Sequence, residues 1–240
     1  MTLIQHVHPL TGQPLEAQAG GLLNESTIVF PCTDGVYRIV QGENYTGNFG
    51  YQWNKFQTTQ IDSVSQVNLS RERFWTQTNW KPEALDGLNI LEVGSGAGRF
   101  TQVLLQDSKA NVYSVDYSDA VDANYRNNGP HERLHLYRAS IYEMPFAPAQ
   151  FDKVFCFGVL QHTPDVAKSV QKLIGMVKPG GELVVEPRAA GGTRVSCRLP
   201  SRRPDEARTD RADTDRSALL QSPTLMVQSQ RNAAQSLPAG

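Results

Sequence analysis

The chain has 240 residues, and its 23 Lys and Arg nearly balance its 24 Asp and Glu, for a formal net charge of −1. This length allows one α/β domain with appendages, and the balanced charge gives no indication of binding to nucleic acid or an acidic membrane surface. No stretch approaches the ~20 apolar residues of a membrane span, and three scattered cysteines form neither a disulfide framework nor a C-x-x-C metal pair. We therefore expect a cytoplasmic protein with no metal, no membrane span and no nucleic-acid partner.

Residues 1–43 are predicted to form an N-terminal lead and a small hairpin. Residues 1–20 are polar and interrupted by prolines, which indicates a mobile lead-in. The apolar runs Thr27–Phe30 and Val36–Val40 flank Asp34–Gly35, a pattern typical of a β-hairpin with that dipeptide in its turn. Cys32 is interpreted as a small buried apolar residue, because a tetrahedral zinc site needs about four ligands.

Residues 44–86 are rich in aromatic side chains and are predicted to be a helical cap segment. Two interpretations of the rings stay open. They pack helices onto the following domain, or they form a lid over a ligand with Tyr45, Tyr51 and Trp53 lining it. Ser70 is expected to cap the helix that starts there, since its hydroxyl can accept from the early N–H groups.

The stretch Ile90–Thr101 is the strongest motif. Apolar residues give way to three alternating glycines, Gly94, Gly96 and Gly98, and apolar residues then return at helical spacing. This pattern predicts a buried strand, a tight turn and a helix start, where glycines allow positive φ and free N–H groups favour an anionic or polar ligand. The dinucleotide fingerprint needs a third glycine where this chain has Arg99, which disfavours a nicotinamide cofactor.

Further strands are predicted downstream of this motif. The second ends in Asp116, about 20 residues past the glycines, where an acid holds a ribose diol in nucleoside-binding folds; the alternative role is a helix N-cap. Asp119 and Asp122 are interpreted as first-turn charges of the next helix. The predicted strands after the first, Leu88–Val93, are Ala110–Asp116, Arg133–Arg138, Phe151–Phe157 and Glu182–Val185.

A helix is predicted between the last two strands. Asp165 is placed to cap it, and the Lys178–Gly181 segment, Lys-Pro-Gly-Gly, is expected to end it in a turn. An apolar stripe at helical spacing is expected to cover the sheet, and it consists of Val166, Val170, Leu173, Ile174 and Val177.

With Glu92 two residues before the first glycine, the loop reads Glu-x-Gly-x-Gly-x-Gly and resembles motif I of the class I S-adenosylmethionine-dependent methyltransferases, type 11-like. Asp116, the Val159–Asp165 segment and the Lys-Pro-Gly-Gly turn follow in the family's order. The resemblance covers Leu88–Glu186. It implies a doubly wound, Rossmann-like α/β domain over residues 87–186, with a mostly parallel sheet and S-adenosyl-L-methionine as cofactor.

The resemblance also implies roles for individual residues. Ser140 stands where the family usually has an Asp that accepts from the adenine amino group, so the hydroxyl can accept this bond without bringing charge. His162 has two open interpretations, acceptor positioning or general base against a structural hydrogen bond. The expected site comprises the catalytic residue His162 and the cofactor-binding residues Glu92, Gly94, Ser95, Gly96, Gly98, Asp116, Tyr117, Ser140, Ile141, Gly158 and Gln161, with Glu92 at the methionine end.

Residues 187–240 differ from the preceding chain. Their basic residues are all arginine, they contain no aromatic residue, and their composition predicts disorder. A basic RNA-binding tail is disfavoured by the interspersed Asp and Glu. We interpret this tail as foreign to the fold, as after truncation or a reading-frame change at Glu186, and we expect the fifth strand to be an exposed apolar edge.

The sequence therefore predicts an S-adenosylmethionine-dependent methyltransferase that acts on a small-molecule or lipid-linked acceptor. The alternative is a truncated, non-catalytic protein that binds S-adenosylmethionine. The acceptor atom and the oligomeric state are not indicated by any motif.

Overall fold

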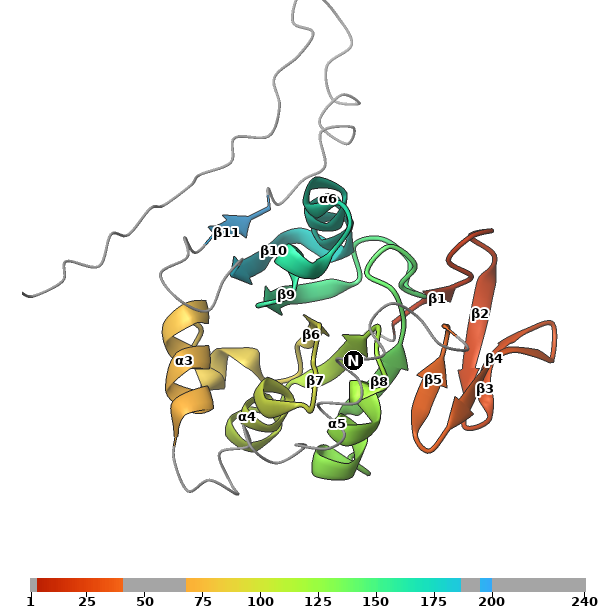
Figure 1. Ribbon diagram of the computed structural model, residues 1–240, viewed down its shortest axis with the longest axis horizontal. Coiled ribbons are helices and arrows are strands. Elements are labelled where there is room, and N and C mark those ends of the chain that lie inside the picture. The colour runs from red at the N-terminus through yellow and green to blue at the C-terminus, as the bar shows by residue number, and fades with distance from the viewer. Residues whose placement is uncertain (1–3, 41–67, 187–194, 200–240) are drawn as a thin grey trace, which may run out of the picture.

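The computed structural model describes residues 4–40, 68–186 and 195–199, and within them the strands form one sheet in the order β1-β2-β3-β4-β5-β8-β7-β6-β9-β10-β11 (Figure 1). The strands are β1 (His6–Val7), β2 (Pro14–Gln18), β3 (Gly21–Asn24), β4 (Thr27–Thr33), β5 (Val36–Arg38), β6 (Asn89–Val93), β7 (Asn111–Asp116), β8 (Leu134–Arg138), β9 (Phe151–Phe157), β10 (Val177–Glu186) and β11 (Val195–Arg198). The helices are α3 (Leu69–Thr78), α4 (Arg99–Asp107), α5 (Ala120–Asn128) and α6 (Val166–Met176), with short 3-10 helices η1 (Pro82–Leu85) and η2 (Leu160–His162).

The centre of the sheet is parallel, from β5 through β8, β7, β6 and β9 to β10. From β6 the chain proceeds outward to β7 and β8, and then returns to the other side of β6 for β9 and β10. This reversal creates a topological switch point between β6 and β9, the place where doubly wound sheets bind ligands beyond their carboxyl ends. The predicted doubly wound, mostly parallel α/β fold is confirmed.

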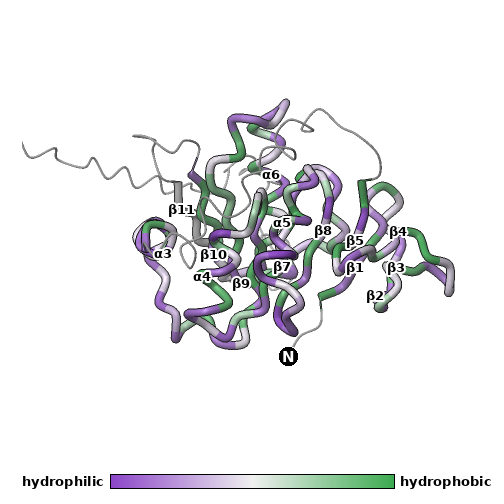
Figure 2. Tube along the Cα trace, turned by 60° about the horizontal axis from the view of Figure 1, so that its bottom comes forward, coloured by the Kyte–Doolittle hydropathy of each residue, from purple (hydrophilic) through white to green (hydrophobic). Residues whose placement is uncertain are grey.

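Alternate residues of the central strands face two different cores. Ile90 and Phe155 pack with Leu104 of α4, whereas Leu91 and Val154 pack in the cluster that includes Leu173 of α6. Helices α3, α4 and α5 accordingly lie on one side of the strands and α6 on the other (Figure 1). Hydrophobic segments run among the central strands and hydrophilic segments along the peripheral loops (Figure 2).

The helix predicted between the last two strands is α6. The Asp165 carboxylate caps it by accepting from the Lys168 N–H at 2.9 Å, as expected. Leu173 of the predicted stripe is fully buried, but Val166 is 46% exposed because it lies in the first turn, beyond the edge of the covered surface. The predicted stripe is therefore wrong at its first position, and its last residue, Val177, belongs to β10 instead of the helix.

The N-terminal residues are more ordered than the sequence indicated. Strands β1 and β2 lie within the residues predicted to be a lead-in, and β2, β3, β4 and β5 form an antiparallel meander. The predicted hairpin is confirmed, with Asp34 and Gly35 at positive φ between β4 and β5. β5 also pairs in parallel with β8, so this module extends the central sheet. Cys32 is partly buried in β4, and burial raises the pKa of its thiol.

His6 anchors the N-terminal module to the domain. Its ring is 8% exposed, lies within hydrogen-bond distance of the buried Tyr137 hydroxyl (Nε2 to Oη, 2.9 Å), and stacks on that ring. On either side of His6, Gln5 and Val7 exchange backbone hydrogen bonds with Ala147 and Pro145. Burial, with a smaller contribution from His135, lowers the pKa of His6 to about 4.

The neutral form of His6 therefore stabilises the fold, and this contribution is expected to decline in acid. Between pH 6.5 and pH 4 the unfolded chain takes up a proton that folded His6 does not, so stability falls as the pH decreases. The loss at pH 4 is about 3 kcal/mol, from 1.36 kcal/mol per pKa unit.

Other groups titrate over the same range, so the measurement compares the wild type with His6→Gln. Urea unfolding at several pH values should show the stability advantage of the wild type shrinking from pH 6.5 to pH 4. A difference that is independent of pH would show that His6 is not buried in its neutral form.

Residues 68–86, with helix α3, Trp80 and the short helix η1, are the described part of the predicted cap segment. Phe74 is fully buried and contacts Trp80 and Phe155 edge to face. The expected cap at Ser70 is wrong, because Asn68 occupies the N-cap and Ser70 is buried inside the helix. The proposed lid residues Tyr45, Tyr51 and Trp53 lie outside the described residues, and the boundaries of the segment stay predictions.

The fifth predicted strand, Glu182–Val185, lies in β10 and is not an open edge of the sheet. β11, within the residues predicted to be disordered, pairs antiparallel with Glu182–Val185 of β10, so the exposed-edge prediction is wrong along this stretch. The predicted turn Lys178–Gly181 is an irregularity inside β10, between its pairs at Val177 and Glu182. Of the tail, only residues 195–199 are described. Among the described helices, none has the length and hydropathy needed to cross a membrane.

Candidate functional site

The glycine-rich loop connects β6 to α4 at the switch point. Gly94 and Gly98 have φ of +83° and +85°, and a Cβ on Gly94 would lie 2.1 Å from Val159 Cγ2. The loop is held against β7 by the Gly94 N–H, which donates to the Val115 carbonyl at 2.7 Å. The predicted strand, turn and helix start are confirmed, and only glycine fits the two positions with this geometry.

Asp116 closes the loop from the end of β7. Its Oδ2 accepts from the Gly96 N–H at 2.8 Å, and its Oδ1 accepts from the Ser118 N–H at 2.8 Å and the Ser118 hydroxyl at 2.7 Å. Burial raises the pKa of Asp116, and the hydrogen bonds from Ser118 and Gly96 oppose that rise. The carboxylate thus lies beside the glycines, although they are about 20 residues away in sequence.

Ser95 contributes an unsatisfied hydroxyl to the loop. The residue is 6% exposed, and its Oγ has no hydrogen-bond partner among the described residues. Buried hydroxyls are normally paired, so an orphan in a glycine-rich loop favours a polar ligand there.

Glu92 lies behind the loop, on the face covered by α4 and α5. It is 2% exposed, and its Oε2 accepts from the hydroxyls of Thr101 and Ser114. Burial raises the pKa of Glu92 to about 7, while the bonds from Ser114 and Thr101 lower it and the charge of Asp116 raises it further. The contacts of this carboxylate are with protein groups beneath the glycines.

A chain of buried and partly buried side chains extends from Glu92 to the loop backbone. Asn124 of α5 donates to the Thr101 hydroxyl at 2.9 Å, and Asn128 donates to Asn124 Oδ1 at 2.8 Å and to the Gly98 carbonyl at 3.0 Å. Asn127 donates to the Ala97 carbonyl at 2.9 Å. The sequence analysis missed these asparagines, because no motif marks them; their only signal is three amides on one short helix.

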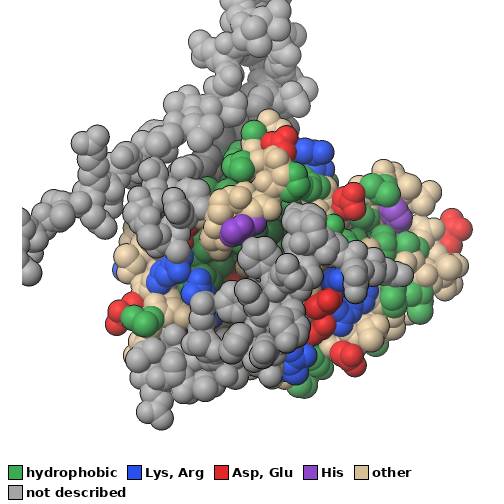
Figure 3. Space-filling view, in the orientation of Figure 1, with side chains coloured by type: hydrophobic (Ala, Val, Ile, Leu, Met, Phe, Trp, Pro, Cys, Tyr) green, Lys and Arg blue, Asp and Glu red, His purple; other side chains and the backbone are tan. Residues whose placement is uncertain are grey.

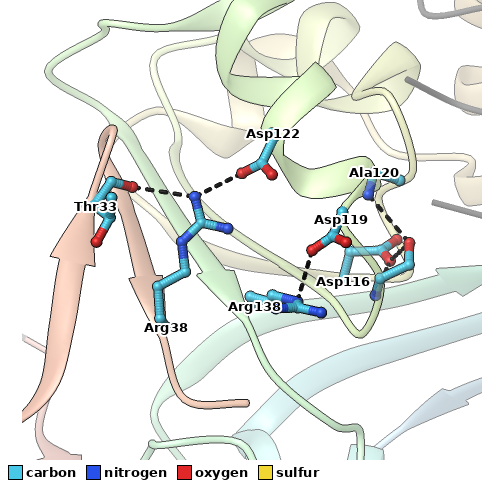
Figure 4. A network of polar contacts seen from close by, with 8 residues as sticks. Thr33, Arg38, Asp116, Asp119, Ala120, Asp122 and Arg138 are labelled. Carbon is cyan, nitrogen blue, oxygen red and sulfur yellow. Dashed lines mark hydrogen bonds and ion pairs between the residues drawn. The ribbon is translucent and has the colours of Figure 1, made fainter. Parts of the chain in front are cut away.

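Two ion pairs fix the start of α5 next to Asp116. Arg38 of β5 and Arg138 of β8 are register partners, and they bind Asp122 at 2.7 Å and Asp119 at 3.0 Å (Figure 4). The prediction that both acids belong to the start of this helix is confirmed, with Asp119 at the N-cap. The N-terminal module thereby supports the loop that carries Asp116.

Ser140 and Ile141 follow β8, two strands from the switch point. Ile141 is buried, while Ser140 is partly exposed, and its Oγ accepts from the Tyr142 N–H at 3.2 Å. Tyr117 is partly exposed directly after Asp116. These three residues lie at the carboxyl edge of β7 and β8, as expected.

Gly158, Gln161 and His162 follow β9, across the switch point. Gln161 Nε2 donates to the Gly158 carbonyl at 2.8 Å and lies 3.3 Å from His162 Nε2. Since the carbonyl requires a donor, the Gln161 amide nitrogen is fixed at this place, beside the imidazole. Both side chains are exposed.

Taken together, the parallel sheet, the glycine turn and the carboxylate after the second strand define a doubly wound α/β domain, a class of fold that binds nucleoside ligands at its switch point. Residues 91–185 match the family model described as "Methyltransferase domain". Through this match, residues 91–185 are similar to the class I S-adenosylmethionine-dependent methyltransferases, whose cofactor is S-adenosyl-L-methionine.

Curated relatives share this region. The chain is 27% identical over 135 residues to a tRNA U34 carboxymethyltransferase of Idiomarina loihiensis, covering 54% of this chain and 42% of that protein. It is 31% identical over 101 residues to a ubiquinone biosynthesis O-methyltransferase of Coxiella burnetii, covering 41% and 43%. The chain thus spans less than half the length of these relatives.

The solved structures that are similar to this chain include the Haemonchus contortus phosphoethanolamine N-methyltransferase 2, in complex with phosphomonomethylethanolamine and S-adenosylhomocysteine. It is 24% identical to this chain, with a TM-score of 0.42 over 49% of this chain and 27% of that one.

Proposed function

We propose that this chain binds S-adenosylmethionine above the carboxyl ends of β6, β7 and β9 and transfers its methyl group to an acceptor. The observation that carries the proposal is the joining of the glycine loop to Asp116, through the Gly96 N–H, at the switch point of the sheet. The unpaired hydroxyl of Ser95 and the open space beside Gly158, where a Cβ would meet no described atom within 4 Å, also fit a ligand there.

Each predicted residue takes a role in this proposal. Gly94, Gly96 and Gly98 allow close approach of the ligand to the backbone, and Asp116 accepts from the two ribose hydroxyls, with Tyr117 beside it. Ser140 and Ile141 contact the adenine, and Gly158 and Gln161 lie near the methionine part. Glu92 is assigned a supporting role beneath the loop in place of direct contact, because the residue is only 2% exposed.

Bound S-adenosylmethionine supplies a methyl group on a positively charged sulfur. The protein aligns the acceptor with that carbon, which removes most of the entropic barrier of a two-molecule reaction. His162, whose Nε2 lies 3.3 Å from Gln161 Nε2, takes the proton of the acceptor or positions it.

We infer a small-molecule or lipid-linked acceptor and a cytoplasmic location. The net charge of −1 and the mixture of Lys, Arg, Asp and Glu on the face in Figure 3 support an acceptor other than a polyanion. The similarity to a ubiquinone biosynthesis O-methyltransferase agrees with this choice. The similarity to a tRNA U34 carboxymethyltransferase makes tRNA the second candidate acceptor.

A transfer assay with radiolabelled S-adenosylmethionine tests this proposal. One arm offers prenylated phenols, and the other offers bulk tRNA. We expect label in the extracted phenols, a rate reduced roughly 100-fold or more by His162→Gln, and unchanged cofactor affinity in that variant. Label in tRNA alone would overturn the acceptor assignment. Saturable cofactor binding without transfer in either arm would favour the non-catalytic binder.

A further inference from the structure

Tyr142 connects the two loops that flank the proposed site. It follows Ser140 and Ile141 on the loop after β8, and its ring packs against the main hydrophobic cluster. Its hydroxyl lies 3.0 Å from both the N–H and the carbonyl of Asp165 and 3.0 Å from the Ser169 hydroxyl. Asp165 is three residues past His162, at the N-cap of α6.

These contacts cross the switch point. Two strands, β7 and β6, separate β8 from β9, so the loops that follow β8 and β9 begin on opposite sides of it. The Tyr142 hydroxyl, which can donate once and accept twice, satisfies polar groups at the start of α6. The backbone N–H of Tyr142 donates to the Ser140 hydroxyl on its own loop. Lys168 Nζ lies 5.2 Å from the centre of the same ring and adds a cation–π contact.

We propose that Tyr142 is a positioning residue that fastens the adenine-side loop, residues 140–143, to the loop of His162, residues 158–165. This inference rests on the proposed function, since it assigns both loops to the cofactor site. Fastening the loops before binding reduces the conformational entropy lost when the cofactor orders them, and this gain appears as affinity. The bonds lie near the surface, where water can replace them, so their effect on global stability is small.

The test compares Tyr142→Phe with the wild type. In hydrogen–deuterium exchange of the free protein, we expect faster exchange in residues 140–145 and also in residues 158–169 of the variant. Calorimetry should show a three- to tenfold weaker affinity for S-adenosylmethionine. The melting temperature should change by less than about 3 °C.

Tyr125→Phe is the matched control. The Tyr125 ring packs against Gly35 and against the cluster of Val36, Val121 and Leu136, away from both loops. Tyr125→Phe should therefore leave exchange and affinity unchanged. Exchange that rises in one loop only, or an unchanged cofactor affinity in Tyr142→Phe, would overturn the inference. If the wild type binds no S-adenosylmethionine, the proposed function fails, and the exchange measurement still decides whether Tyr142 couples the loops.

Discussion

Replacing Gly98 by alanine is expected to cost about 3 kcal/mol or more of folding free energy and to weaken cofactor binding at least 100-fold. The residue has φ of +85°, which strains any side chain by about 1–3 kcal/mol. An added Cβ would also lie 2.1 Å from Asn124 Oδ1 and 2.4 Å from Asn128 Nδ2. Asn124 is fully buried and bonded to Thr101, so it cannot move without breaking the network under the loop.

Gly87→Ala is the matched control for this substitution. Gly87 has a similar φ of +72°, but a Cβ there would meet no described atom within 4 Å. Chemical unfolding should therefore show only the backbone strain in Gly87→Ala, about 1 kcal/mol, with normal cofactor affinity. Equal losses in the two variants would mean that the asparagine network does not constrain Gly98.

Removing the Asp116 carboxylate should abolish measurable binding of S-adenosylmethionine. Asp116→Ala loses the acceptor for the Gly96 N–H and the proposed acceptor for two ribose hydroxyls. Hydrogen bonds to a charged group contribute about 1.5–3 kcal/mol each, so the combined loss corresponds to a factor of at least 100 in affinity. Calorimetry on the folded variant measures this loss.

Two further variants test whether the loss of affinity comes from the Asp116 carboxylate itself. Asp119→Ala removes the next carboxylate, which is 51% exposed and pairs with Arg138, and its affinity should stay within about threefold of the wild type. Asp116→Asn retains one acceptor oxygen and should bind with intermediate affinity. Normal binding by Asp116→Ala would exclude this carboxylate from the site.

The central elements could be predicted because each leaves a local pattern in the sequence. Phe151–Phe157 is an uninterrupted strand in the prediction and in the structure. The glycines predict the position of the turn before α4 to within one residue. The short strands β1 and β2 were missed for the opposite reason. Their positions depend on partners elsewhere in the chain, such as Pro145 and Ala147 for the residues around His6.

The candidate site likewise has features that the sequence predicts and features that it does not. The motif order placed Asp116 beside Gly96, and both loops after β8 and β9 lie at the expected edge of the sheet. The sequence could not reveal that Glu92 is engaged from behind by Thr101 and Ser114, since these contacts join residues 9 and 22 positions apart. Tyr142 was missed because a single tyrosine in a loop carries no periodic signal.

Calorimetric titration of the purified full chain with S-adenosylmethionine, with NADH as the comparison ligand, tests the central claim most directly. We expect saturable binding of one S-adenosylmethionine per chain, no heat of binding with NADH, and loss of the signal in Asp116→Ala. A soluble, folded wild-type chain that binds no S-adenosylmethionine, or that prefers NADH, would contradict the assignment of this site.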